Sequence, residues 1–120
     1  MANAAILIEW GMPRDGRENK ALEVFFSTMQ NWEQWKAAGR IESFHTFGTL
    51  SGNMEQRAGF IVVMGTEQQI AALHKADDYR QQLVKVITIG VNVTITNCET
   101  GDAMATRMQR YATTLKSMGL

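Results

Sequence analysis

Apolar positions along the chain form short runs in some segments and helical stripes in others. The runs at 4–10, AAILIEW, and 59–65, GFIVVMG, are short and rich in β-branched residues, which predicts two strands. The segment 41–50, IESFHTFGTL, predicts a third strand. Between the segments 4–10 and 41–50, a helix is predicted over 16–38 because its apolar residues recur at helical spacing. These residues are Leu22, Phe25, Phe26, Met29 and Trp32.

Capping signatures mark where helices begin and end. Asp15 with Glu18, and Thr66 with Gln69, have the spacing of a reciprocal N-terminal cap, so helices are expected to begin just after Asp15 and just after Thr66. Gly39 stands where a left-handed residue closes the first of these helices. The second helix is expected to end near residue 75.

The segment that follows fits two interpretations. Asp78 with Gln81 forms a third capping signature, and apolar residues continue at helical spacing up to Ile87. However, the apolar residues from 87 to 95 also alternate as they would in one long strand. Gly90 suits a helix end, and one strand over that whole length would outrun its neighbours, so we predict helix to about 88 and strand over 91–97.

A final helix is predicted over 102–118, with Asp102 as its cap and apolar residues spaced four, three, four and three. These residues are Met104, Met108, Tyr111, Leu115 and Met118. The order of elements is therefore β-α-β-β-α-β plus a C-terminal helix. This order predicts one α+β domain over 1–120, in which a ferredoxin-like four-stranded antiparallel sheet carries helices on one face.

The predicted strands are apolar on both faces. Leu7 opposes Ile6 on the first strand, and Val62 opposes Ile61 on the third. A bare face of this kind would exceed the apolar patch that monomers usually expose. We therefore expect a second copy of the sheet to cover it, in a two-fold homodimer.

With these features, the chain resembles the dimeric α+β barrel superfamily over residues 4–97. The resemblance rests on the element order, on the two-faced strand GFIVVMG and on the segment HKADDYRQQLVKVITIGVNVTI. It implies a barrel formed by two ferredoxin-like sheets and a pocket for a small molecule. The superfamily includes cofactor-independent monooxygenases, isomerases, haem-handling enzymes and ligand sensors, and the resemblance transfers no site residue to this chain.

Charge and composition exclude several classes of function. Twelve Lys and Arg residues balance twelve Asp and Glu residues, without a block of like charge, so neither a nucleic acid nor a membrane surface is expected as a partner. No apolar run has the length of a membrane span, and a cytoplasmic location is expected. Cys98 is the only cysteine, which excludes an internal disulfide. No phosphate-binding or dinucleotide-binding motif is present, and no cofactor is predicted.

His45, in the middle of the predicted strand 41–50, is the best candidate for chemistry because an imidazole can give and take a proton near neutral pH. If the strands pair suitably, Glu9 and Asn92 would join His45 in a partly polar hollow, with Glu9 orienting the imidazole. The alternative is a structural histidine that hydrogen-bonds within the sheet or to a partner chain.

Trp10, Asn92 and Thr94 are the candidate ligand-binding residues around that hollow. Two functions follow from this pattern. The first is an enzyme without cofactor, resembling a monooxygenase or an isomerase, that acts on a small apolar or aromatic metabolite with His45 and Glu9 as catalytic residues. The second is a non-catalytic dimer that binds a ligand or serves as a dimerisation module. His74, in the predicted helix that ends near residue 75, is a candidate axial ligand of haem, and a surface or cap-stabilising role is the preferred interpretation.

Overall fold

The computed structural model describes residues 1–120 and has four strands and four helices. In chain order these are β1 (Ala4–Trp10), α1 (Glu18–Ala37), β2 (Ser43–Gly48), β3 (Gly59–Gly65), α2 (Glu67–Lys75), α3 (Asp77–Ile89), β4 (Thr94–Glu99) and α4 (Gly101–Ser117). The strands form one antiparallel sheet in the order β2-β3-β1-β4. The predicted ferredoxin-like α+β fold is therefore confirmed.

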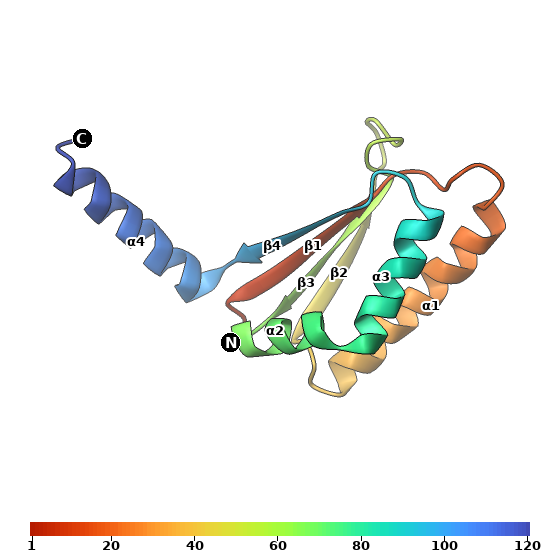
Figure 1. Cartoon of the computed structure of the whole chain (residues 1–120), viewed down its shortest axis with the longest axis horizontal. Coiled ribbons are helices and arrows are strands. Elements are labelled where there is room, and N and C mark those ends of the chain that lie inside the picture. Colours follow the sequence, from red (N-terminus) through yellow and green to blue (C-terminus); the bar gives the residue numbers. More distant parts are fainter.

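The four helices are distributed unevenly between the two sides of the sheet. Figure 1 shows α1, α2 and α3 on one side of the sheet and α4 projecting away on the other side. None of the residues of α4 is buried. The radius of gyration is 16.9 Å, whereas a compact chain of this length would have about 14 Å. The difference reflects the projecting α4. None of the four helices combines the length and apolar character that a membrane crossing needs.

Strand register decides which side chains face the helices. Ile6 lies opposite Val63, and Ile8 lies opposite Ile61, so these four share one face, and all of them are buried. The residues between them, such as Leu7 and Val62, point to the other face. We call that second face, which none of the helices covers, the open face.

Aromatic rings hold α1 and α3 on the sheet. Trp32 and Trp35 of α1 are buried, with ring centroids 4.9 Å apart in an edge-to-face arrangement. Tyr79 of α3 contacts both, at centroid distances of 6.0 and 6.4 Å. Phe44 of β2, whose ring lies 6.5 Å from that of Trp32, packs against this aromatic part of the core.

Several predicted element ends differ from the structure. The reciprocal cap at Thr66 and Gln69 is confirmed, because both of its hydrogen bonds are present. The caps expected at Asp15 and Asp78 are wrong: α1 begins at Glu18 without a side-chain cap, and α3 begins at Asp77 after Ala76. The Asp78 carboxylate is used instead by an ion pair with Arg40.

The predicted strand 91–97 and the predicted helix start at Asp102 also shift. β4 begins at Thr94 because Asn92 adopts a left-handed conformation, with φ of 53°, that a strand does not admit. At the far end β4 continues to Glu99, and α4 follows from Gly101 after Thr100. Asp102 thus lies in the first turn of α4 rather than at its cap.

Tyr79→Phe is expected to stabilise the protein, because the Tyr79 hydroxyl is buried and makes no hydrogen bond. The expected gain at pH 7 is about 1 kcal/mol in the free energy of unfolding. Burial raises the pKa of Tyr79 from 10.0 to about 12. The unfolded chain therefore loses the phenol proton first, and stability should fall as pH rises from 10 towards 12. Tyr79→Phe should remove this contribution.

Urea unfolding at pH 7 and at alkaline pH measures both effects. Tyr111→Phe is the matched control, because Tyr111 is 64% exposed and should respond at neither pH. A loss of stability in Tyr79→Phe at pH 7 would contradict the assignment of an unsatisfied hydroxyl.

Candidate functional site

A cavity of about 260 Å³ lies between the sheet and the paired helices α1 and α3. Its lining is predominantly apolar. Representative lining residues are Ile8, Trp10, Trp32, Leu83, Val86 and Ile89. These side chains come from β1, α1 and α3, and the cavity therefore depends on how the helices are seated on the sheet.

The two tryptophans of α1 explain where the cavity opens. Trp32 and Trp35 pack the C-terminal half of α1 tightly into the core. In the N-terminal half, by contrast, Leu22 and Phe25 also line the cavity yet stay 57% and 36% exposed. The large indole rings of Trp32 and Trp35 hold one end of the helix on the sheet, and space remains under the other end.

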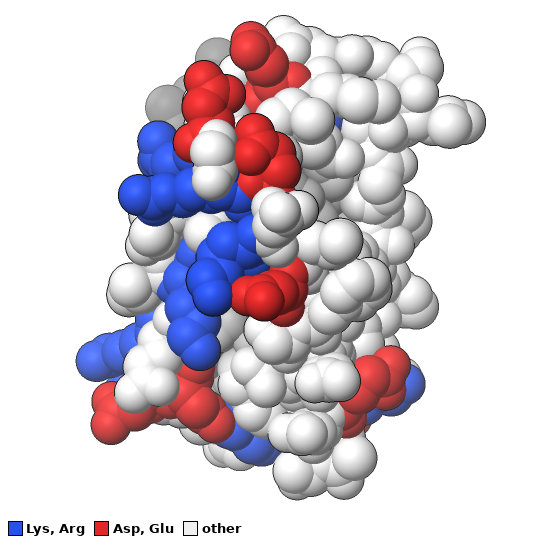
Figure 2. Space-filling model, turned by 90° about the vertical axis from the view of Figure 1, so that its right-hand side faces the viewer, with Lys and Arg blue, Asp and Glu red and all other residues white.

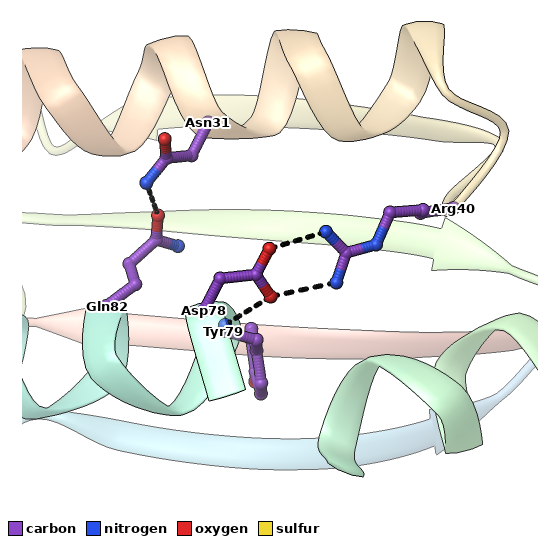
Figure 3. A network of polar contacts seen from close by, with 5 residues as sticks. All are labelled: Asn31, Arg40, Asp78, Tyr79 and Gln82. Carbon is purple, nitrogen blue, oxygen red and sulfur yellow. Dashed lines mark hydrogen bonds and ion pairs between the residues drawn. The ribbon is translucent and has the colours of Figure 1, made fainter. Parts of the chain in front are cut away.

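One buried amide aims a polar group into this apolar space. Gln82 of α3 is only 4% exposed and lines the cavity. Its Oε1 accepts a hydrogen bond of 2.8 Å from Nδ2 of Asn31 on α1, and its Nε2 makes no hydrogen bond within the protein. In Figure 3 the nitrogen of Gln82 points away from Asn31. Trp32, which also lines the cavity, has a buried indole N–H without a partner.

An ion pair fixes the ends of α1 and α3 relative to each other. The guanidinium of Arg40 donates two hydrogen bonds, of 2.6 and 2.9 Å, to the carboxylate of Asp78 (Figure 3). These hydrogen bonds hold the pKa of Asp78 below its usual value of 3.8, and the ion pair is therefore kept at neutral pH. Arg40 also lies 5.0 Å from the centre of the Trp35 ring. The pair thus covers the tryptophan end of the core.

Charged side chains occupy only part of the surface on this side of the molecule. Figure 2, which faces the side of Figure 1 where α1 and α3 lie, shows Lys and Arg gathered along one margin, with Asp and Glu among them. The opposite half of the view is mostly uncharged, apart from one mixed group of acidic and basic side chains near its lower edge.

The open face carries the residues from which the sequence predicted chemistry. Strand register places His45, Val62, Leu7 and Thr96 in one row across the sheet, and Glu9 in the row beside it. His45 and Glu9 therefore share a face, with β3 between their strands. Their Cα atoms are about 12 Å apart, from strand spacing and one two-residue step. The predicted contact between them is not formed within the chain.

Glu9 is engaged elsewhere. Its Oε2 forms an ion pair with Nε of Arg57, and its Oε1 accepts a hydrogen bond of 3.3 Å from Thr94. The guanidinium of Arg57 also lies 5.8 Å from the ring of Phe60. These contacts tie the loop between β2 and β3 to the open face, and the Glu9 carboxylate does not orient His45.

The three predicted ligand-binding residues separate in space. Trp10 lines the cavity on the helix side, where its ring lies 6.3 Å from that of Phe25. Thr94 lies on the open face with Glu9. Asn92 lies in the loop before β4, and its Nδ2 donates a hydrogen bond of 2.8 Å to the backbone oxygen of Glu55. The polar hollow expected around His45, Glu9 and Asn92 is therefore absent from the single chain.

His74 has a structural contact. Its Nε2 lies 2.8 Å from Oδ1 of Asn97 on β4, and its ring meets Tyr79 edge to face at 5.7 Å. No group of three or more His, Cys, Asp or Glu side chains converges in the structure. Cys98 is a free, exposed thiol, and it lies opposite Ala5 on the open face.

Comparison with known proteins identifies the fold. No protein-family model matches the chain, and no curated protein matches it. Among solved structures, a dimeric ferredoxin-like protein of unknown function from Jannaschia sp. CCS1 is similar, with a TM-score of 0.65 at 10% identity. The match covers 81% of this chain and 98% of that protein.

Two further structures are similar to the same extent. One is a dimeric protein of unknown function and ferredoxin-like fold from Bacteroides fragilis NCTC 9343, with a TM-score of 0.61 at 9% identity over 81% of this chain and 95% of that one. The other is a dimeric ferredoxin-like protein of unknown function from Thermobifida fusca, with a TM-score of 0.60 at 13% identity over 82% and 92%. The chain shares the ferredoxin-like fold of these proteins.

Glu9→Gln should lower the free energy of unfolding by up to about 1 kcal/mol, because it removes an ion pair whose arginine is half exposed. Thermal unfolding in low and high salt measures this, and high salt should reduce the difference. Glu55→Gln is the control. Glu55 is exposed in the loop between β2 and β3, which also carries Arg57, and its side chain forms no ion pair. Equal stability of the two variants in low salt would contradict a structural role for Glu9.

Proposed function

We propose that this protein binds a small, uncharged apolar or aromatic molecule in the cavity between α1, α3 and the sheet, and that it does so as a homodimer. One observation carries the proposal. A mostly apolar cavity contains a nearly buried amide whose nitrogen has no partner in the protein. An apolar enclosure with a few fixed polar groups is the usual form of a small-molecule site.

The size of the cavity limits the ligand. An apolar cavity of about 150 Å³ is sufficient for benzene. At about 260 Å³ this cavity suits a molecule with two fused rings or a short branched chain. The Nε2 group of Gln82 would donate a hydrogen bond to a carbonyl or ether oxygen on such a ligand. This bond would satisfy a donor that has no partner within the protein.

The homodimer is supported by the open face. Leu7, Val62, Met64 and Phe60 alternate with the buried core residues and lie together on it. The rings of Phe60 and Phe47 stack there with centroids 4.8 Å apart, and Phe47 is 47% exposed. A second copy packed on this face would remove an apolar patch of the kind that monomers rarely expose.

Binding is favoured over acid–base catalysis in this cavity. Glu18 is the one ionisable residue among those lining it, and it is exposed at the start of α1. His45 faces the other side of the sheet. A catalytic role for His45 and Glu9 stays a prediction, and it would need groups supplied by a second copy across the open face.

Titration with 2-acetonaphthone tests the cavity, because Trp10 and Trp32 line it and should change their fluorescence on binding. Native mass spectrometry of the same samples should show a dimer that takes up two molecules of the probe. Ala21→Phe fills the space and should weaken binding at least tenfold. His45→Gln should leave the affinity unchanged.

Ala72→Phe is the matched control, because Ala72 is exposed on α2 and does not line the cavity. Its affinity should stay within twofold of that of the unmodified protein. Equal weakening by the two alanine variants would contradict binding in the cavity. Weakening by His45→Gln would instead support a site on the open face.

Gln82→Leu tests the hydrogen bond. The unmodified protein should prefer 2-acetonaphthone to 2-ethylnaphthalene, which has the same shape without the carbonyl oxygen, by roughly fivefold, the value of one hydrogen bond of about 1 kcal/mol. In Gln82→Leu the ratio of the two dissociation constants should fall to about one. Gln81→Leu, an exposed neighbour, should keep the preference. An unchanged ratio in Gln82→Leu would exclude Gln82 as the donor.

A further inference from the structure

The apolar side of α4 has no cover within the chain. Met104, Met108 and Tyr111 are 48%, 50% and 64% exposed, and no residue of the helix is buried. Their spacing, continued by Leu115 and Met118, makes one continuous stripe. A single helix of this length is marginal in water without packing, so its stability requires another surface.

The junction with β4 directs α4 away from its own chain. Only Thr100 separates the two elements. The backbone N–H of Thr100 donates a hydrogen bond of 3.1 Å to the oxygen of Asn3, and Gly101 has a φ of 59°. A Cβ on Gly101 would lie 3.2 Å from the backbone oxygen of Ala2. The junction thus packs against the start of β1, and α4 leads away from the helices that cover the sheet (Figure 1).

This direction leads α4 towards the space in front of the open face. Figure 1 shows α4 on the side of the sheet opposite to α1 and α3. A second sheet stacked on the open face would lie about 10 Å away. With 17 residues, α4 extends about 25 Å, far enough to pass the edge of that second sheet and reach the helices behind it.

The area of contact also requires α4. The open face measures about 400 Å² from strand number, strand spacing and length. A stable interface usually takes about 800 Å² from each partner. One side of α4 adds about 250 Å². Because each copy both contributes one helix and receives one, the sheet face and the helix together reach about 900 Å² per copy.

Charge favours packing of α4 on residues 1–100 of the second copy, which we call its body, over packing on the α4 of that copy. Three basic residues of α4, Arg107, Arg110 and Lys116, accompany one acidic residue, Asp102. Residues 1–100 contain nine basic and eleven acidic residues. Two α4 helices would repel each other, whereas α4 and the body of a partner carry opposite net charge.

We infer that α4 is an exchanged arm whose apolar stripe packs along the flank of a second copy of this chain. The inference uses the homodimer of the proposed function and adds an interface that the open face does not contain. Each copy holds the other by one helix and receives one in return, as two-fold symmetry requires.

Sedimentation of the full chain tests the arm. Met108→Asp with Tyr111→Asp places two charges on the stripe, and the dissociation constant of the dimer should rise at least tenfold. Gln109→Asp with Thr113→Asp places the same charges on the opposite side of α4. For this variant the dissociation constant of the dimer should stay within twofold of that of the unmodified protein. Circular dichroism and 2-acetonaphthone binding verify that the body of each variant is folded.

Cross-linking of an equal mixture of ¹⁴N-labelled and ¹⁵N-labelled protein provides the second measurement. Cross-links from Lys116 to the body should include mixed-isotope pairs, which only two different copies produce. Equal dimerisation of the two double variants, or cross-links of Lys116 in same-isotope pairs alone, would overturn the arm while leaving a dimer through the open face. If the unmodified protein is monomeric at all concentrations tested, both the dimer and the arm are wrong. Cavity binding is then tested by the 2-acetonaphthone titration alone.

Discussion

A sheet that is apolar on both faces has to be covered twice. In this chain the constraint arises from β1 and β3, where Ile6 and Val63 point to the helices and Leu7 and Val62 point away from them. The helices α1, α2 and α3 cover the first face (Figure 1). No helix covers the second, and Arg57 of the loop between β2 and β3 reaches over only part of it. The assembly proposed above follows from this constraint.

The indole rings of α1 decide the shape of the space on the covered face. Trp32 and Trp35 occupy the layer between helix and sheet at one end, supported by Tyr79 and by the Arg40–Asp78 ion pair. The other end of α1, which carries Leu22 and Phe25, is packed less closely on the sheet and leaves the cavity. The cavity and the core are therefore two consequences of one distribution of side-chain volume along α1.

Local patterns in the sequence were sufficient for most of the fold. The bounds of β1, β3 and α2 match their predictions because each of these signals, an apolar run or a capping box, is complete within a few residues. The caps expected at Asp15 and Asp78 are not formed, and for Asp78 the reason is a competing partner that a capping signature does not reveal. For Asp78 that partner is Arg40, which is distant in sequence.

The candidate site was less predictable, because it depends on register and on helix contacts. His45 and Glu9 were expected to meet, and one intervening strand keeps them apart. The sequence does not indicate Gln82 as a site residue, because a glutamine within a helical stripe is ordinarily solvated. The available signal was its position three residues after Tyr79 on the apolar side of α3, where both are buried.

Alternation along the strands separates the two proposed surfaces. Ile8 and Ile61 line the cavity, whereas their neighbours Leu7 and Val62 lie on the open face. Successive residues of one strand therefore contribute side chains to different surfaces, and both surfaces are built on the same strand backbone. The two surfaces stay chemically independent because no side chain belongs to both.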